Sequence, residues 1–317
     1  MQPILELRSV VKDFASHRAV DGISLAFEAG KFYSLLGPSG CGKTTTLRLI
    51  AGFETPTTGE ILLNGVNVNE KPPYQRNVST VFQSYALFPH LTVERNVAFG
   101  LVQRGVRELQ GRIGAALEMV HLAGKEKRYP SELSGGERQR VALARSIVLE
   151  PEVLLLDEPL AALDLKLRRA MRAELKEMQR RTGITFLFVT HDQEEAMAMS
   201  DQVAIMHRGR IEQIGVPQDV YRSPATRFVA GFLGAMNWFG NAGVRPESLR
   251  VSRNGQGWRC SATVTQSLFL GSCSHVMMRL ESGEQAVAEV RLEEEEFRPG
   301  EAVHLYWSDA DEIRFPQ

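Results

Sequence analysis

The segment 37–44, which reads GPSGCGKT, constrains the fold of this 317-residue chain more than any other feature. In this spacing the glycines let backbone N–H groups turn toward phosphates, Lys43 reaches the β and γ oxygens, and the Thr44 hydroxyl ligates Mg²⁺. The apolar run 31–37 predicts a strand before the loop, and residues 43–52 predict a helix after it. The positive end of that helix favours the same anion, so the sequence predicts an α/β domain that binds phosphate.

Two acidic residues and a histidine follow two further apolar runs. Asp157 and Glu158 end the run VLLLDEP, and His191 follows the run at 184–190. Both runs are continuously apolar, as in parallel strands that are covered on both faces, and ligands collect at the carboxyl ends of such strands. We expect Asp157 to hold Mg²⁺ directly or through water, and Glu158 to act as general base toward the attacking water. A lone histidine is usually structural, but His191 is placed to reach the γ-phosphate.

A second anion cradle lies in the segment 131–146, which reads SELSGGERQRVALARS. Its Gly-Gly pair allows close backbone approach, and the helix that follows points its positive end at an anion. One γ-phosphate cannot easily use two such cradles. The arrangement is explained if two copies of the chain meet head to tail, so that the cradle of each copy closes over the nucleotide of the other.

The pattern of apolar and polar residues divides the chain into two domains. The first 210 residues or so read as an α/β unit with a mostly helical insert at about 90–150, and the basic face of the helix predicted at 166–183 reads as solvated surface. From about residue 240 short alternating runs with turn signals predict a small all-β sandwich or barrel, with a hairpin turn at 281–284. The acidic run Glu293–Glu296 is expected to be an exposed loop.

Bulk properties exclude several classes of protein. The net charge of −1 implies no general attraction to nucleic acid or anionic lipid. Three scattered cysteines predict neither a disulfide framework nor a structural zinc site. No secretory signal is expected, and no apolar run approaches the ~20 residues that span a bilayer. Work at a membrane would therefore require a partner.

Taken together, the motifs closely resemble those of the ATP-binding cassette (ABC) ATPases. The phosphate loop, a glutamine loop at Gln83, the LSGGE segment, VLLLDEP, LAALD and His191 occur in the family's order and spacing over residues 4–235. The resemblance implies a P-loop (RecA-like) core at 1–236 with a helical subdomain at about 88–150, and a TOBE-like (OB-like) β domain at 240–317. It also implies ATP and Mg²⁺ as cofactors and ATP hydrolysis as the activity.

The resemblance assigns roles to individual residues. It implies that Phe14 stacks on adenine, although an aromatic near the N-terminus is more often core. It also implies that Gln83 senses Mg²⁺ and couples to membrane subunits, and that Asp164 lies between the two sites of a dimer. The expected catalytic residues are Glu158, His191, Gln83 and Lys43, and the expected metal ligands are Thr44, Gln83 and Asp157. The expected nucleotide contacts are Phe14, Gly37, Pro38, Ser39, Gly40, Cys41, Gly42, Lys43, Thr44, Thr45, Ser134, Gly135, Gly136, Glu137 and Asp164.

Within this family the chain looks most similar to importer ATPases for polyamines (spermidine and putrescine). The segments ELKEMQRRTGITFLFVTHDQEEAMAMSD and FVAGFLGAMNWF carry this resemblance, and GVRPESLRV at 243–251 resembles the entry to the TOBE-type domain of the same importers. It implies a homodimer on the cytoplasmic face of the inner (plasma) membrane, two transmembrane permease subunits, an extracytoplasmic solute-binding protein, and no nucleic acid. Importers of ferric iron, phosphonate or thiamine share much of the pattern. A soluble cassette protein of DNA repair or translation, and a non-hydrolysing regulatory subunit, are the alternatives from other classes.

Three features depart from the family pattern. Glu137 stands where the LSGGQ-type motif usually has glutamine, which adds a carboxylate near a phosphate, but we still expect activity. Ala161 replaces the usual serine before ALD and is expected to loosen the dimer contact slightly. The C-terminal domain is short for the polyamine subclass, which weakens any transfer of a regulatory role to it.

Overall fold

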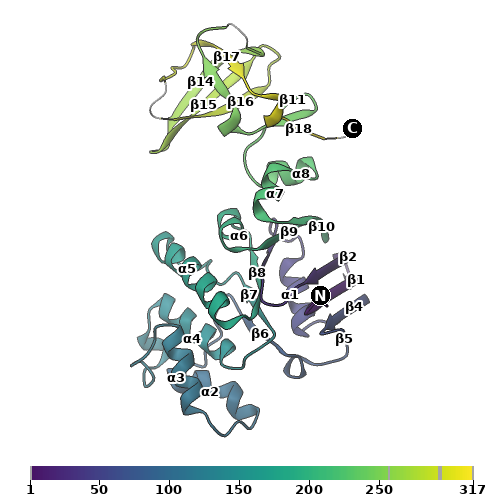
Figure 1. Cartoon of the computed structure of the whole chain (residues 1–317), viewed down its shortest axis with the longest axis vertical. Helices are drawn as coiled ribbons and strands as arrows, with labels where there is room; N and C mark the ends of the chain where they lie inside the picture. Colours follow the sequence, from purple (N-terminus) through teal and green to yellow (C-terminus); the bar gives the residue numbers. More distant parts are fainter. Residues whose placement is uncertain (1, 256–257, 292–294, 316–317) are drawn as a thin grey trace. The chain divides into compact units, whose positions relative to one another are not determined.

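The computed structural model describes residues 2–255, 258–291 and 295–315 (Figure 1). The chain divides into two compact units, residues 1–218 and residues 219–317. The domain boundary expected at 236–240 falls inside the second unit, and the extents 1–236 and 240–317 stay a prediction. In the described part of the chain, no helix is both long enough and apolar enough to cross a membrane.

The first unit is built on a six-stranded sheet. Its strand order is β10-β9-β3-β8-β7-β6, and every pair is parallel except β9 with β10. The bounds are β3 (Phe32–Leu36), β6 (Val78–Val81), β7 (Val153–Asp157), β8 (Thr185–Thr190), β9 (Gln202–His207) and β10 (Arg210–Gly215). The strands predicted at 31–37, 152–157 and 184–190 are thus confirmed.

Side chains alternate between two cores, one on each face of this sheet. Leu154, Leu156 and Phe186 pack into a core with the helices of the insert. Leu155 and Leu187, one residue along, pack into a second core with the first helix and the N-terminal strands. Burial on both faces explains why these strands read as unbroken apolar runs.

The N-terminal strands form a separate antiparallel sheet of order β2-β1-β4-β5. The bounds are β1 (Leu5–Phe14), β2 (His17–Phe27), β4 (Thr58–Leu63) and β5 (Val66–Asn67). β1 and β2 extend up to the turn at 15–16, and the parts nearest the turn form an extension of the hairpin. The extension is rich in charged residues, and Arg18 pairs with Asp13 at 2.8 Å across it. Cross-strand pairing, rather than an apolar pattern, holds this part of the hairpin.

Helices cover the first unit. α1 (Lys43–Ala51) follows the phosphate loop as predicted, and the helical insert contains α2 (Val93–Gln103), α3 (Gln110–Met119) and α4 (Gly135–Ile147) (Figure 1). α5 (Leu165–Thr182) confirms the helix predicted at 166–183 and buries Met171, Leu175 and Met178 on one stripe. The remaining helical elements of this unit are α6 (Gln193–Met199) and the 3-10 turns η1 (Pro73–Gln75) and η2 (Pro130–Glu132).

The second unit is mainly β-structure with its own apolar core. A five-stranded sheet has the order β13-β17-β14-β15-β16, and a three-stranded sheet has the order β11-β12-β18. The hairpin turn predicted at 281–284 joins β15 and β16, and the Leu280 N–H donates to the Glu284 carbonyl at 2.9 Å. The bounds are α7 (Pro217–Arg222), α8 (Arg227–Phe232), β11 (Asn237–Phe239), β12 (Ala242–Val244), η3 (Pro246–Ser248), β13 (Arg250–Ser252), β14 (Cys260–Phe269), β15 (Cys273–Leu280), β16 (Gln285–Arg291), β17 (Ala302–Tyr306), η4 (Asp309–Asp311) and β18 (Ile313–Arg314).

Arg245 ties the two short helices of this unit to its β-structure. Its guanidinium is buried and donates to the carbonyls of Tyr221, Ala230 and Ala235. The acidic run expected to be a loop lies partly outside the described residues. Within it, Glu295 pairs with Arg253 at 2.6 Å and is exposed.

Candidate nucleotide site

The phosphate loop joins β3 to α1 and is held by close backbone contacts. Gly42 has φ of +107°, and a Cβ at this position would lie 2.3 Å from the Ala19 carbonyl oxygen. The Lys43 side chain is buried, and its Nζ donates to the carbonyls of Gly37 (2.7 Å) and Pro38 (3.0 Å). The lysine ammonium therefore lies inside the curve of the loop, where a phosphate would be the natural counter-charge.

Thr44 and Asp157 lie together at the carboxyl edge of the sheet. The Thr44 hydroxyl donates to Asp157 Oδ1 at 3.3 Å. Burial raises the pKa of the Asp157 carboxyl, and the neighbouring Glu158 carboxylate raises it further, whereas Thr44 opposes the shift. A half-buried carboxylate with a raised pKa gains most from a bound cation, and hydroxyl and carboxylate oxygens are the donors that Mg²⁺ prefers.

Glu158 and His191 face each other at the ends of two adjacent strands. Glu158 has a left-handed φ of +44°, which is rare for a residue with a side chain. Its N–H donates to the Val189 carbonyl at 3.0 Å, and its Oε1 lies 3.3 Å from His191 Nδ1. Strained backbone of this kind is concentrated at functional sites because the surrounding structure must enforce it. The pair is held where a general base and its partner would be needed.

A buried glutamate that the sequence did not point to anchors the residue before the histidine. Glu195 is 4% exposed, and its Oε2 accepts a 2.7 Å hydrogen bond from the Thr190 hydroxyl, one residue before His191. Its other oxygen lies 3.7 Å from the Arg168 guanidinium of α5. Burial raises the pKa of the Glu195 carboxyl. The network links the residue before His191 to α5, the helix that Asp164 caps.

We expect Glu195→Ala to lower kcat for ATP hydrolysis about tenfold with little change in KM, because His191 loses its support and a tenfold loss is only about 1.4 kcal/mol. The kcat of Glu195→Gln should lie between those of wild type and Glu195→Ala, since the amide oxygen can still accept a hydrogen bond from the Thr190 hydroxyl. The neighbouring Glu194 is the matched control, because its side chain is 73% exposed and pairs with Arg172. Steady-state rates of the purified variants check this, and an equal loss in Glu194→Gln would contradict it.

The LSGGE segment forms the N-terminus of α4. The Ser134 hydroxyl accepts from the Glu137 N–H at 3.3 Å, and Glu137 Oε2 accepts from the Ser134 N–H at 2.7 Å. This is a capping box, a role that glutamine can fill as well as glutamate. Glu137 also pairs with Lys125, and these contacts lower the pKa of its carboxyl to about 2. The carboxylate of Glu137, which replaces the usual glutamine, is thus directed toward Lys125 and the N-terminus of α4.

We expect Glu137→Gln to change the ATPase rate less than about twofold, because the amide keeps the capping contact and the ion pair with Lys125 is only partly buried. The lowered pKa means that the carboxylate stabilises the fold above its unfolded pKa of about 4.3. This stabilisation of the folded state should be lost as the pH falls toward 2, and Glu137→Gln should lack it at every pH. Denaturation midpoints at pH 7 and pH 3 compare the two proteins, and a large loss of activity at pH 7 would contradict the capping role.

The segment after Gln83 is fixed to α4 by an arginine. Gln83 is exposed, and Tyr85 and Ala86 have left-handed φ values of 62° and 45°. Arg145 donates to both of their carbonyls, at 2.9 and 2.7 Å. Any rotation of α4 would therefore move the Gln83 loop, although nothing in the sequence around Arg145 distinguishes it from the other basic residues of that helix.

Other predicted residues lie at the surface of the same unit. Phe14 is 37% exposed at the β1–β2 turn and stacks on His17, with ring centroids 5.5 Å apart. Asp164 is the N-cap of α5 and accepts from the Leu167 N–H at 2.9 Å. Among the described residues, no hydrogen bond or ion pair connects Ser134, Gln83 or Phe14 with the Asp157 and Glu158 pair. The structure groups Lys43, Thr44, Asp157, Glu158 and His191 at one edge of the sheet.

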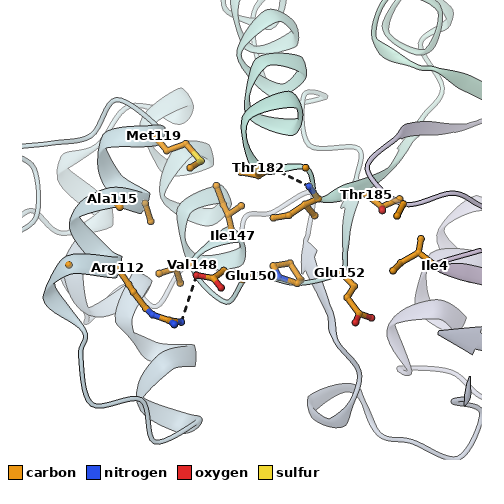
Figure 2. A pocket seen from close by; sticks show the side chains of 16 residues that line it. Ile4, Arg112, Ala115, Met119, Ile147, Val148, Glu150, Glu152, Thr182 and Thr185 are labelled. Carbon is orange, nitrogen blue, oxygen red and sulfur yellow. Dashed lines mark hydrogen bonds and ion pairs between the residues drawn. The ribbon is translucent and has the colours of Figure 1, made fainter. Parts of the chain in front are cut away.

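A cavity lies elsewhere in the first unit. It has a volume of about 680 Å³ and opens between α3, the end of α4 and the amino ends of β7 and β8. Figure 2 shows Met119, Ile147 and Val148 facing it, with Arg112 and Glu150 at one rim, 3.8 Å apart. The residues predicted to bind nucleotide lie at the carboxyl ends of the same strands, so this cavity is distinct from the candidate nucleotide site.

Comparison with known proteins agrees with these motifs. The ABC transporter family matches residues 20–161, and the TOBE domain family matches residues 242–315. The spermidine/putrescine import ATP-binding protein PotA of Rubrobacter xylanophilus is 47% identical, over 96% of this chain and 91% of that protein.

Two solved structures of ATP-binding cassette proteins are also similar to this chain. CbiO1 of Clostridium perfringens, part of the ABC transporter complex CbiONQ, has a TM-score of 0.65 and 30% identity, over 70% of this chain and 91% of its own. The ATP-binding cassette MJ0796, solved as a dimer in a post-hydrolysis state with ADP and Pi, has a TM-score of 0.60 and 30% identity, over 67% of this chain and 98% of its own. This chain therefore belongs to the ABC transporter family, as an ATP-binding protein whose cassette is followed by a TOBE domain.

Proposed function

We propose that this chain is the ATP-hydrolysing subunit of a polyamine importer. The proposed ATPase activity rests on one observation. Glu158 pairs with His191 beside the Thr44–Asp157 pair, at the carboxyl ends of the strands, where the phosphate loop also lies. Lys43 and the loop N–H groups would bind the ATP phosphates, Glu158 would accept the proton of the attacking water, and His191 would orient that carboxylate toward the γ-phosphate.

The residues present fit a Mg²⁺ ion. Thr44 Oγ1 and Asp157 Oδ1 are 3.3 Å apart, and burial raises the pKa of the Asp157 carboxyl, so a bound cation would stabilise its charged form. We infer that these two residues hold the ion, with Gln83 on the exposed loop as a further ligand when the site is assembled. The ion would neutralise charge on the β and γ phosphates; proton transfer remains the task of Glu158.

A second copy of the chain would complete each site. Ser134 caps α4 and Gly136 lies in its first turn, at the positive end of the helix, and on our proposal they meet the γ-phosphate held by the partner copy. Phe14 would stack on the adenine and Asp164 would lie between the two sites. Support comes from the dimeric MJ0796 structure and from the absence of a contact, in the described residues, between Ser134 and this copy's own Asp157 or Glu158.

The proposal places the dimer on the cytoplasmic face of the membrane, below two permease subunits that a solute-binding protein supplies. Support comes from exposed apolar side chains around the Gln83 loop: Phe53 is 47% exposed and Phe99 is 40% exposed. The Phe99 ring packs on Phe88 of the loop at 4.5 Å between centroids. Exposed aromatic groups beside a loop that is tied to α4 would let a membrane partner respond to nucleotide binding.

We expect Phe99→Asp to lower solute uptake at least about tenfold while the ATPase rate of the isolated subunit stays within about twofold, because a charge in an apolar contact is costly but the nucleotide site is untouched. Phe269→Asp is the control, since Phe269 is 70% exposed in the TOBE unit. Uptake in cells and hydrolysis in vitro measure the two effects. Equal uptake by Phe99→Asp and wild type would contradict the docking role.

The assignment of polyamines as the transported solute rests on relatives named for spermidine and putrescine import. One of these relatives is 47% identical to this chain over 91% of its own length. The test is uptake in cells that lack the gene, complemented with wild type or Glu158→Gln, using putrescine, spermidine, ferric iron, a phosphonate and thiamine. A polyamine defect that only wild type rescues is expected. A defect in another solute would overturn the polyamine assignment and leave the ATPase role standing.

A further inference from the structure

The TOBE unit contains a cluster of three different metal-binding side chains. Cys273 and His275 are two residues apart on β15, and Glu289 on β16 is the cross-strand partner of His275. Alternate residues of a strand point to the same face, and paired residues on neighbouring strands share that face. The register therefore places a thiol, an imidazole and a carboxylate side by side on one face of the sheet.

The donor atoms are close enough to share one ion. One donor atom from each side chain lies within 4.8 Å of the other two, and His275 Nε2 is 3.9 Å from Glu289 Oε2. In a tetrahedral zinc site, with metal–ligand distances of about 2.0–2.3 Å, donors are about 3.3–3.8 Å apart. Small rotations of the side chains would bring them to that spacing without movement of the strands.

The mixture of donors selects the kind of metal. Thiolate and imidazole favour zinc and other late first-row ions, whereas Mg²⁺ and Ca²⁺ prefer oxygen ligands alone. A histidine–glutamate ion pair by itself would need no cysteine beside it. In the described residues of the chain this is the one cluster of three such side chains whose donor atoms come this close together.

We propose that Cys273, His275 and Glu289 form a zinc-binding site on the outer face of the TOBE sheet. The half-buried thiol, the imidazole and the carboxylate supply three ligands, and a fourth position stays open to water or to an incoming group. β16 is the edge strand of its sheet, so the ion would link this edge to β15.

Cobalt binding to the full-length protein tests the proposal. The metal-stripped chain, without nucleotide, is titrated with Co²⁺, and we expect thiolate-to-cobalt absorption in the near ultraviolet that one equivalent of Zn²⁺ removes. Cys273→Ser should abolish this absorption. Cys260→Ser is the matched control, because Cys260 is another half-buried cysteine of the same sheet, and it should leave the absorption unchanged.

A second variant keeps the thiol and guards against misfolding. His275→Gln should weaken Co²⁺ binding at least about tenfold, and Zn²⁺ should raise the Tm of wild type and Cys260→Ser but of neither ligand variant. Absence of a thiolate band in wild type would overturn the proposal. So would a band that persists in Cys273→Ser, which would assign the metal to Cys41 or Cys260.

Discussion

Replacing Glu158 with glutamine is expected to lower the rate of ATP hydrolysis by about 10²–10⁴-fold, the usual contribution of a general base, while ATP still binds. Glutamine has the size of glutamate and can keep the contact to His191, which lies 3.3 Å away. It cannot accept the proton of the attacking water. A phosphate-release assay measures the rate, and equilibrium binding of a fluorescent ATP analogue measures affinity.

Glu152 provides the control for this change. It directly precedes β7, whereas Glu158 directly follows it, so the two glutamates lie at opposite ends of one strand. Glu152→Gln should hydrolyse ATP at nearly the wild-type rate. Equal rates for wild type and Glu158→Gln would show that another group takes the proton.

Replacing Gly42 with alanine is expected to lower ATP affinity by at least about 100-fold. The new Cβ would lie 2.3 Å from the Ala19 carbonyl oxygen and 2.5 Å from Met206 Cε, and the backbone φ of +107° is unfavourable for any side chain. The loop would have to move away from β2, and the N–H groups before α1 would no longer converge. Nucleotide titration of the purified variant measures the loss.

Gly124→Ala is the control that distinguishes the cost of a left-handed φ from the cost of a steric clash. Gly124 also has a left-handed φ, +83°, but a Cβ there would meet nothing within 4 Å. We expect about 1 kcal/mol of lost stability and unchanged ATP affinity. Thermal unfolding and the same titration compare the two variants. If Gly42→Ala bound ATP as well as Gly124→Ala does, the close contact with Ala19 would play no part in shaping the loop.

The contiguous parts of the site could be predicted from sequence. The phosphate loop and the pair Asp157 and Glu158 each follow a buried strand within a few residues, so local pattern was enough to place them. The same holds for the alternation that predicted β14 and β15 and the turn after them. The two cores, one on each face of the six-stranded sheet, follow from the unbroken apolar character of its strands.

Supporting contacts could not be predicted, because they join residues far apart in sequence. Arg145 holds carbonyls 59 and 60 positions earlier, and Glu195 meets Arg168 from another helix. Glu137 is a mixed case: its capping contact with Ser134, three residues away, follows from the local S-x-x-E spacing, whereas its ion pair with Lys125 does not. A buried ionic contact depends on tertiary packing, for which sequence spacing carries no signal.

The most direct test of the account is the mass of Glu158→Gln in solution, measured by light scattering with and without Mg²⁺ and ATP. The account predicts a monomer without nucleotide and twice that mass with it, because the Ser134 segment of each copy would close over the ATP of the other. Adding Ser134→Arg should prevent the increase. A protein that stays monomeric at saturating ATP, or a dimer that the Ser134 change leaves intact, would contradict a site shared between two copies.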